Sequence, residues 1–590
     1  MTYTRVVNMR KPCLLLVLTA CGAIMTCANA FGAGGTCPSG ANYLNPANPA
    51  GPQVTLSSLG VTSCYYISAS GSDSNNGTGE STPWLHAPGM PTCTSTCKST
   101  TPASGNGFIF RGGDAWHFGN SGASPYTGGT WNWTWQGSSS NAIYVGVDMA
   151  WYSGSSWARP ILTDDNPTST STVGSCTHTI GGFVSINPAG YMHFDNFELT
   201  GLCWNSGPGG PNYIYWQSPN QNSNTPPFYI ENNYVHGWTH TTYSTNCSDS
   251  LPCAVATVAF GGPGNYGGVV LQFNVLDGSD SDDTGVSATG SGAGDAYIVQ
   301  YNVFRHYGGG TVANNCHIVH DNLFEYLNNG NNLSTVHTDG WACYGEANDS
   351  THGGDGTPNL FYNNVTRYVG TEYSAPLSFT WWIYPSRSGA NADMMFNNIF
   401  YEIYANPNNY ITVCYGSPCG DLDLWNNTLS AEVQDYQSDI FGIPTSGNVV
   451  KSVNNHWITN AGSTPSAVFS STSTVTESTP VYQTLSAANA QGYTVSNGFE
   501  PTSSSGSTVT TSGTNETSAF CSGLSNTVAQ SYCVQGTSAG CSYNTTNHTV
   551  TCPSRTPAAR PASGGWNVGA YQFSSGGAPA APTNLVATAN

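Results

Sequence analysis

Charge is the scarcest property of this 590-residue sequence, because only 7% of its residues are Asp, Glu, Lys or Arg. Basic residues are rarer than acidic ones, with 12 against 32. A chain with so few cations and a formal net charge of −20 is a poor match for phosphate groups, so we expect no nucleic-acid partner. The same balance disfavours a polyanionic glycan and favours a neutral or weakly acidic one.

Long apolar runs are missing after residue 30, so no later segment predicts a transmembrane helix. Residues 1–30 combine Arg5, Arg10 and Lys11 with the apolar run CLLLVLTACGAIMTC and then ANA. This order predicts a secretory signal peptide cleaved after Ala30. In the alternative, LTAC is a lipoprotein box and Cys21 carries a lipid anchor.

Cysteine is plentiful, and 16 of the 19 cysteines follow residue 30. An even number in an exported chain indicates disulfide bonds, and short separations predict the pairs Cys93–Cys97, Cys247–Cys253 and Cys414–Cys419. Lipidation at Cys21 would leave Cys27 as an odd thiol, so secretion is favoured over anchoring. Aromatic residues make up 12% of the sequence, and Val, Ile and Phe recur along it, so the chain has the material for a core and is not expected to be disordered.

Asparagine marks a repeat. Eight fragments share an apolar or aromatic lead-in, an asparagine, one variable residue and usually another apolar residue: IENNYVHG, LQFNVLDG, VQYNVFRH, VHDNLFEY, FYNNVTRY, MFNNIFYE, LWNNTLSA and SVNNHWIT. Their asparagines lie at 233, 274, 302, 322, 364, 398, 427 and 455, in steps of 20 to 42 residues. The shorter steps fit one turn of a β-solenoid, and the longer ones fit a turn with an inserted loop. Asparagine tolerates the left-handed conformation of a sharp turn, and its amide can bond to the turns above and below, so we expect an asparagine ladder.

This pattern resembles the right-handed parallel β-helix of the pectate-lyase-like superfamily and covers about residues 65–573. YYISASGSDSNNGTGESTPWLHAPG with FIFRGGDAWHFG is similar to the entry segment of secreted bacterial members, and WNVGAYQF is similar to their closing strand. The resemblance implies an all-β fold with an entry or cap segment at 31–110 and a parallel β-helix at 111–573, with Ser/Thr-rich, Cys-containing loops at 463–561. Residues 574–590 are expected to be a linker and the truncated start of a module that resembles fibronectin type III.

The run STVHTDGWACYG, residues 334–345, alternates small residues with His337, Asp339 and Trp341. In a strand the alternate side chains share a face, so these three are expected to point outward together, about 7 Å apart. A carboxylate and an imidazole can move protons, and an indole can stack on a sugar ring. An exposed polar strand with an incidental tryptophan is the alternative. FTWWIYP falls one coil later and places Trp381 or Trp382 as an extension of the same platform.

Two further loops belong to consecutive coils with this strand. DGSDSDDTG contributes Asp282 and Asp283, and FRHYGGG contributes His306 and Tyr307. Coils stack at about 4.8 Å, so equivalent positions of three neighbouring coils fall within roughly 10 Å. HTDG with the aspartate pair partly resembles the motifs of polygalacturonase-like hydrolases. The resemblance implies an inverting hydrolase, whose carboxylates are about 6.5–9.5 Å apart.

The sequence is compatible with three hypotheses for the function of this site. The first is a secreted glycoside hydrolase that needs no cofactor, with Asp339 and either Asp282 or Asp283 as acid and base, His306 and His337 orienting them, and Trp341, Trp381, Trp382 and Tyr307 holding the sugar. The second is a calcium-dependent lyase acting on a polyuronate, with Asp277 and Asp280 among the metal ligands. The third is a non-catalytic glycan-binding or adhesin-like solenoid. In each, a polysaccharide is the partner and the protein is expected to be a monomer.

A column of charges lies three residues beyond the ladder asparagines. His236, Asp277, Arg305, Glu325 and Arg367 occupy this position, and their signs alternate from Asp277 onward. Such alternation predicts a structural salt-bridge ladder on the outer face, worth about 0–1 kcal/mol per pair. Arg305 and Arg367 would then be unavailable as catalytic bases.

Overall fold

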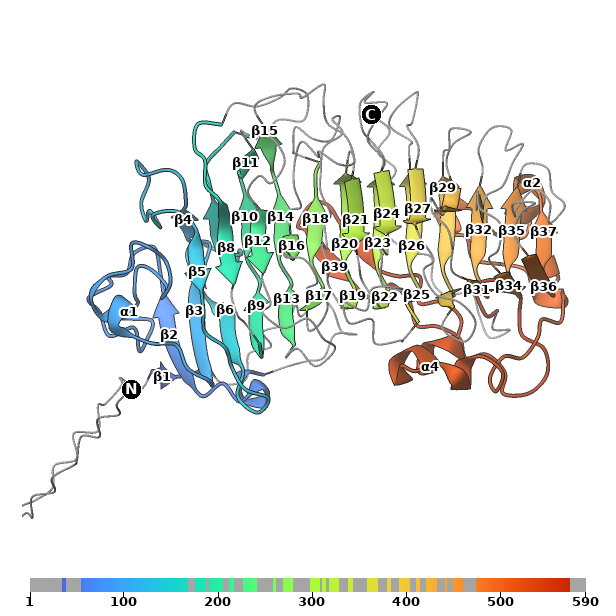
Figure 1. Cartoon of the computed structure of the whole chain (residues 1–590), viewed down its shortest axis with the longest axis horizontal. Coiled ribbons are helices and arrows are strands. Elements are labelled where there is room, and N and C mark those ends of the chain that lie inside the picture. Colours follow the sequence, from blue (N-terminus) through green and yellow to red (C-terminus); the bar gives the residue numbers. More distant parts are fainter. Residues whose placement is uncertain are drawn as a thin grey trace, which may run out of the picture.

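The computed structural model describes the chain in segments that together form one elongated stack of strands (Figure 1). The described residues are 34–38, 55–167, 176–186, 190–204, 212–216, 227–240, 258–260, 269–279, 298–307, 310–314, 318–327, 338–342, 358–369, 379–383, 392–403, 410–413, 421–431, 441–442, 449–459 and 474–573. None of the helices in these segments is long and apolar enough to cross a membrane.

Two long sheets run the length of this stack. In the described residues the first sheet has 14 strands: β1 (Gly35–Thr36), β2 (Ser63–Ile67), β3 (Asn106–Gly112), β6 (Ile143–Tyr152), β9 (Met192–Asp195), β13 (Phe228–Glu231), β17 (Val269–Gln272), β19 (Ile298–Gln300), β22 (Ile318–His320), β25 (Leu360–Tyr362), β28 (Asp393–Phe396), β31 (Leu422–Trp425), β34 (Val449–Val453) and β36 (Thr474–Ser478). The second sheet has 12: β4 (Ala115–His117), β7 (Ile161–Thr163), β10 (Glu198–Thr200), β14 (Tyr234–His236), β18 (Val275–Asp277), β20 (Val303–Tyr307), β23 (Leu323–Leu327), β26 (Val365–Val369), β29 (Ile399–Ile403), β32 (Thr428–Ala431), β35 (His456–Thr459) and β37 (Val481–Gln483).

A third face completes most of the coils in the described residues. It consists of β5 (Trp131–Trp133), β8 (Gly182–Ile186), β12 (Asn212–Trp216) and β16 (Val258–Phe260), and further along of β21 (Gly310–Asn314), β24 (Thr338–Ala342), β27 (Phe379–Ile383), β30 (Tyr410–Val413) and β33 (Phe441–Gly442). The small sheet of β11 (Cys203–Trp204) and β15 (Thr239–His240) lies between the second-sheet strands and this face in chain order. At the N-terminal end β1 pairs with β2 in antiparallel fashion. From β3 onward the chain visits first sheet, second sheet and third face in turn, and these strands pair in parallel with their counterparts one coil away. The predicted parallel β-helix is therefore confirmed.

The asparagine ladder lies at the turn from the first sheet to the second. In each step the backbone N–H and the side-chain amide of one asparagine donate to Oδ1 of the next, over 2.9–3.2 Å. The ladder contains all eight predicted members: Asn233, Asn274, Asn302, Asn322, Asn364, Asn398, Asn427 and Asn455. All eight are buried, so the ladder supplies their backbone and amide groups with partners that water cannot reach to provide.

One detail of the turn differs from the prediction. The left-handed residue is the one before each ladder asparagine, with φ of 53° to 59° at Asn232, Phe273, Tyr301, Asp321, Asn363, Asn397, Asn426 and Asn454. The two demands are therefore divided between neighbours: the first residue makes the bend, and the second bonds along the stack.

The core is filled from inward rows of the sheets. One such row of the first sheet consists of Phe194, Ile230, Leu271, Val299, Val319, Phe361, Met395 and Leu424, all at most 1% exposed. Phe304 and Phe324 of the second sheet stack at 5.1 Å between ring centroids. Equivalent residues of neighbouring coils thus pack on one another, and burial of each side chain is worth about 1.5–3 kcal/mol.

Residues 484–573, the C-terminal segment, double back along the outside of the solenoid from its end at β37 to its middle (Figure 1). The segment contains α2 (Leu485–Asn489), α3 (Ser507–Thr510), α4 (Thr527–Cys533) and the hairpin of β38 (Ser542–Asn544) and β39 (Thr549–Thr551). Phe520 stacks on Trp425 of the first sheet at 4.1 Å. Residues 463–561 were expected to be loops, but in the described part of this range β36 and β37 extend the two long sheets and the elements named above add further regular structure.

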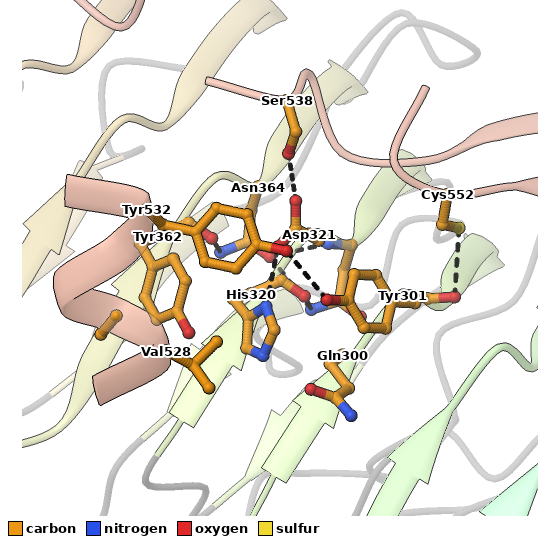
Figure 2. Close-up of polar contacts among 12 residues, drawn as sticks. Gln300, Tyr301, His320, Asp321, Tyr362, Asn364, Val528, Tyr532, Ser538 and Cys552 are labelled. Carbon is orange, nitrogen blue, oxygen red and sulfur yellow. Dashed lines mark hydrogen bonds and ion pairs between the residues drawn. The ribbon is translucent and has the colours of Figure 1, made fainter. Parts of the chain in front are cut away.

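Figure 2 shows the contacts between the C-terminal segment and the turn that carries the asparagine ladder. The Tyr532 hydroxyl lies 3.0 Å from that of Tyr301, and the Ser538 hydroxyl donates to Asp321. Cys552 Sγ contacts the carbonyl oxygen of Tyr301 at 3.4 Å. The segment is thus bonded to successive coils rather than resting on their surface.

Five disulfides are present in the described residues: Cys37–Cys64, Cys93–Cys97, Cys176–Cys203, Cys521–Cys533 and Cys541–Cys552. The predicted pair Cys93–Cys97 is confirmed, and it lies at helix α1 (Ser95–Ser99) near the N-terminal end. The predicted pairs Cys247–Cys253 and Cys414–Cys419 lie outside the described residues.

Candidate functional site

The bend from the second sheet toward the third face changes character along the solenoid. Early coils carry glycine there, with φ of 74° at Gly201 and 67° at Gly237. Later coils carry His306, Tyr326, Tyr368 and Glu402 in the same left-handed region, with φ of 52° to 57°. We call these four residues the corner column. A left-handed backbone costs a residue with a side chain about 1–2 kcal/mol, and such strain gathers at functional sites.

The rings of the corner column form a stack along the solenoid. His306 and Tyr326 lie 4.9 Å apart between centroids with 12° between planes, and Tyr326 and Tyr368 lie 5.0 Å apart with 17°. Both tyrosines are partly exposed. Sequence reasoning selected His306 but missed the others, although all follow a ladder asparagine by four residues, and that shared spacing could have revealed them.

The charge column one residue earlier forms the predicted salt-bridge ladder. Arg305 Nε lies 3.8 Å from Asp277 Oδ2 and 3.3 Å from Glu325 Oε1, and Arg367 Nη2 lies 2.7 Å from Glu325 Oε2. His236 pairs instead with Glu198, 3.0 Å away. The salt-bridge ladder was expected on the outer face with the small energies of surface pairs, and Asp277, Arg305 and Glu325 are only 2–6% exposed.

A short hydrogen bond joins Asp277 of the salt-bridge ladder to His306 of the corner column. His306 Nδ1 lies 2.8 Å from Asp277 Oδ1, and the backbone N–H of Ser279 donates to the same oxygen over 2.9 Å. Burial alone would raise the pKa of Asp277, but the hydrogen bond from His306 and the charge of Arg305 outweigh it and lower that pKa to about 2. Asp277 is thus an ionised carboxylate that fixes one imidazole nitrogen of His306.

The third face aligns three other predicted residues. Asp339 and Trp341 lie in β24, where Trp341 is the register partner of Trp382 in β27 and Asp339 that of Thr380. Trp381 immediately precedes Trp382 in the same strand, and Tyr307 is the partner of Leu327 at the end of β20. The backbone therefore brings Asp339, Trp341 and Trp382 together, and the direction of their side chains stays a prediction.

Asp280, Asp282, Asp283 and His337 lie outside the described residues. Within the described part of the chain, no group of three or more His, Cys, Asp or Glu side chains is arranged to hold a metal ion. Asp277, one of the two expected calcium ligands, has both carboxylate oxygens within reach of protein groups, since Tyr543 and Arg305 approach Oδ2. This environment favours Asp277 as the partner of His306.

The described basic residues lie outside the strands of the third face. Eight of the nine that follow residue 30 are described, and none of these eight belongs to a third-face strand: Lys98, Arg111, Arg159, Arg305, Arg367, Lys451, Arg555 and Arg560. Burial acts to lower the pKa of Arg367, but Tyr401 and Glu325 raise it well above its ordinary value, and Glu325 and Asp277 likewise raise that of Arg305. Both guanidinium groups therefore stay protonated and cannot act as bases.

A second pair of carboxylates lies on the outer side of the first sheet. Asp195 and Glu231 are register partners, and both are 0% exposed. The Tyr144 hydroxyl donates to Asp195 over 2.6 Å, while Glu231 is bonded to His193 at 2.7 Å and to Gln272 at 2.6 Å. Burial and the neighbouring Glu231 raise the pKa of Asp195 well above its ordinary value. This closed network is a structural feature of the fold rather than a substrate site.

Comparison with known proteins gives weak matches only. No protein-family model and no curated protein matches the chain. Among solved structures, pectate lyase Pel9A aligns over 71% of this chain and 78% of its own at 13% identity, with a TM-score of 0.37. The GH136 lacto-N-biosidase from Eubacterium ramulus aligns over 71% and 67% at 13% identity and a TM-score of 0.34, and a rhamnogalacturonan lyase over 70% and 87% at 13% and 0.31. The fold assignment therefore rests on the strand register of this chain.

Proposed function

We propose that this protein is a secreted polysaccharide-degrading enzyme, a glycoside hydrolase whose substrate lies along the third face beside the corner column. The Asp277–His306 pair carries the proposal, because it stands where the chain bends toward the strands of Asp339, Trp341 and Trp382. An ionised, buried carboxylate that holds an imidazole is an arrangement suited to proton transfer. The five disulfides support export.

In this proposal two carboxyl groups divide the chemistry. Asp339 and either Asp282 or Asp283 act as general acid and general base across the glycosidic bond, which requires no metal. His306, held by Asp277, and His337 orient or tune these carboxyl groups. Trp341 with Trp381 or Trp382 stacks on sugar rings, and Tyr307 adds a contact at the bend.

The basic residues favour hydrolysis over elimination. A lyase acting on a polyuronate needs a base for the C5 proton and a cation for the carboxylate. Arg305 and Arg367 form ion pairs with Glu325 in the salt-bridge ladder. Lys451 lies on the first sheet, 4.4 Å from the centroid of a Trp425 ring. A lyase would then have to use His306 or His337 as its base, or Arg387, which follows β27 in sequence.

The test is a panel of neutral and uronate-containing polysaccharides, with and without a chelator. New reducing ends without ultraviolet absorbance of an unsaturated product are expected, unaffected by the chelator. Asp339→Asn should lower kcat by about 10²–10⁴-fold, whereas Asp423→Asn, on the first sheet, should leave it unchanged. Absorbance that disappears with the chelator or in Arg387→Ala would establish a lyase instead. Binding without cleavage would establish the adhesin.

A further inference from the structure

We propose that the β38–β39 hairpin of the C-terminal segment positions the Asp277–His306 pair, with Tyr543 as the positioning residue. This inference rests on the proposed function, since it assigns His306 a role in catalysis. Tyr543 is separated from Asp277 by 266 residues in the sequence, yet its hydroxyl points to Asp277 Oδ2 at 3.5 Å.

The ring of Tyr543 acts through Arg305. The Arg305 guanidinium carbon lies 5.1 Å from the centroid of the Tyr543 ring and 5.2 Å from that of Tyr326. Contact of a cation with an aromatic face is favourable and strengthens as water is excluded. The hairpin and the corner column therefore hold the same guanidinium, and this group lies beside Asp277 and Glu325.

His548 fixes the hairpin in place. Its Nδ1 lies 2.6 Å from the Tyr543 hydroxyl, and its ring stacks on Tyr234 at 3.9 Å between centroids. The disulfide Cys541–Cys552 closes the hairpin, and Cys541 Sγ contacts the carbonyl oxygen of Asp321 at 3.0 Å. The hairpin is thus anchored to two coils, at Tyr234 and at Asp321.

Burial by this hairpin gives the pair its strength. Asp277 is 2% exposed, so its attraction to Arg305 and His306 acts through a medium of low dielectric constant. Without the Tyr543 ring, water would reach the ladder and weaken both attractions. His306 would then sample other orientations, and a misplaced proton-transfer group costs rate rather than substrate affinity.

The experiment compares Tyr543→Ala, Tyr543→Phe and the control Thr545→Ala, whose side chain is exposed at the hairpin tip. The readouts are kcat and KM on the polysaccharide that the wild type cleaves, the melting temperature, and the Nδ1 proton resonance of His306 in protein with isotope-labelled histidine. His306→Gln identifies that resonance by its disappearance.

Tyr543→Ala is expected to lower kcat by about ten- to a hundredfold with KM within about twofold, and to weaken or remove the His306 resonance. Tyr543→Phe keeps the ring over Arg305 and should recover most of both, and Thr545→Ala should match the wild type. A folded Tyr543→Ala with an unchanged resonance and unchanged kcat would overturn the inference, as would a folded Tyr543→Phe as impaired as Tyr543→Ala. If the wild type cleaves no polysaccharide, the proposed function fails, while loss of the resonance in Tyr543→Ala alone would still support the positioning of His306.

Discussion

The dipeptide Asn363–Asn364 offers a sharp test of the ladder, because two adjacent buried asparagines have opposite environments. Asn364 donates from Nδ2 to the oxygens of Val319, Tyr362 and Asn398 over 2.9–3.2 Å, and its Oδ1 accepts from the N–H and Nδ2 of Asn322, both at 3.0 Å. Among the described residues, neither amide atom of Asn363 has a hydrogen-bond partner.

Asn364→Ala should therefore be strongly destabilising. It leaves the buried N–H of Asn322 without its acceptor and removes several further bonds, each worth about 1 kcal/mol, while an orphaned buried group costs about 1–3 kcal/mol. We expect a loss of about 2–5 kcal/mol in the free energy of unfolding. Asn364→Asp should be no milder despite its shape, because it places an oxygen against three acceptor oxygens.

The matched control is Asn363→Gly, which removes an unbonded amide and keeps a backbone with φ of 54° that glycine adopts readily. Its cost should stay within about 1 kcal/mol. The free energies of unfolding are measured in urea by tryptophan fluorescence, and they can be compared directly if the variants share the same dependence on urea concentration. If Asn364→Ala lost no more stability than Asn363→Gly, the ladder would contribute nothing beyond the turn itself, and the reasoning would be refuted.

Three further predictions concern other buried groups. The pKa of Asp277 is lowered from 3.8 to about 2, so its ionised form stabilises the fold above pH 3.8 and this contribution of about 2 kcal/mol is lost as the pH falls through about 2; urea unfolding should show this in the wild type and not in Asp277→Asn. Burial lowers the pKa of His456 from 6.5 to about 3, so stability should fall by about 1.4 kcal/mol per pH unit on acidification between those values, a slope that His456→Gln removes. Arg560→Met deletes hydrogen bonds to the carbonyl oxygens of Gln535, Gly569 and Ala570 and should lower the free energy of unfolding by about 3 kcal/mol or more, measured in the same way; a variant as stable as the wild type would contradict this.

The ladder and the strand order were accessible from sequence because both arise from local demands repeated in every coil. Each asparagine occupies the same place relative to its own strand, so eight fragments report one geometry even when the loops between them vary from coil to coil. The charge column followed in the same way, since equal spacing from the ladder puts Asp277, Arg305, Glu325 and Arg367 in register.

Contacts between distant parts of the chain left no comparable trace. Nothing near Tyr543 or His548 signals that these residues cover the charge column, because that contact depends on how a segment folds back over the solenoid. The salt-bridge ladder was for this reason expected to have the energies of surface pairs, while Asp277, Arg305 and Glu325 are buried. The divided roles of Asn363 and Asn364 were also hidden, since the sequence shows two asparagines and the backbone tells them apart.

Solenoids usually fray at their ends, where the terminal coil has a neighbour on one side only. Here the last coils are tied to the middle ones, because the C-terminal segment bonds to Asn454 through Thr514 at one end and packs on Tyr234 through His548 at the other. Amide hydrogens of the final coils should thus exchange with solvent only when a large part of the stack opens at once. Such a molecule withstands stepwise unwinding from its C-terminal end, which would protect it from proteases that cleave unfolded chain ends.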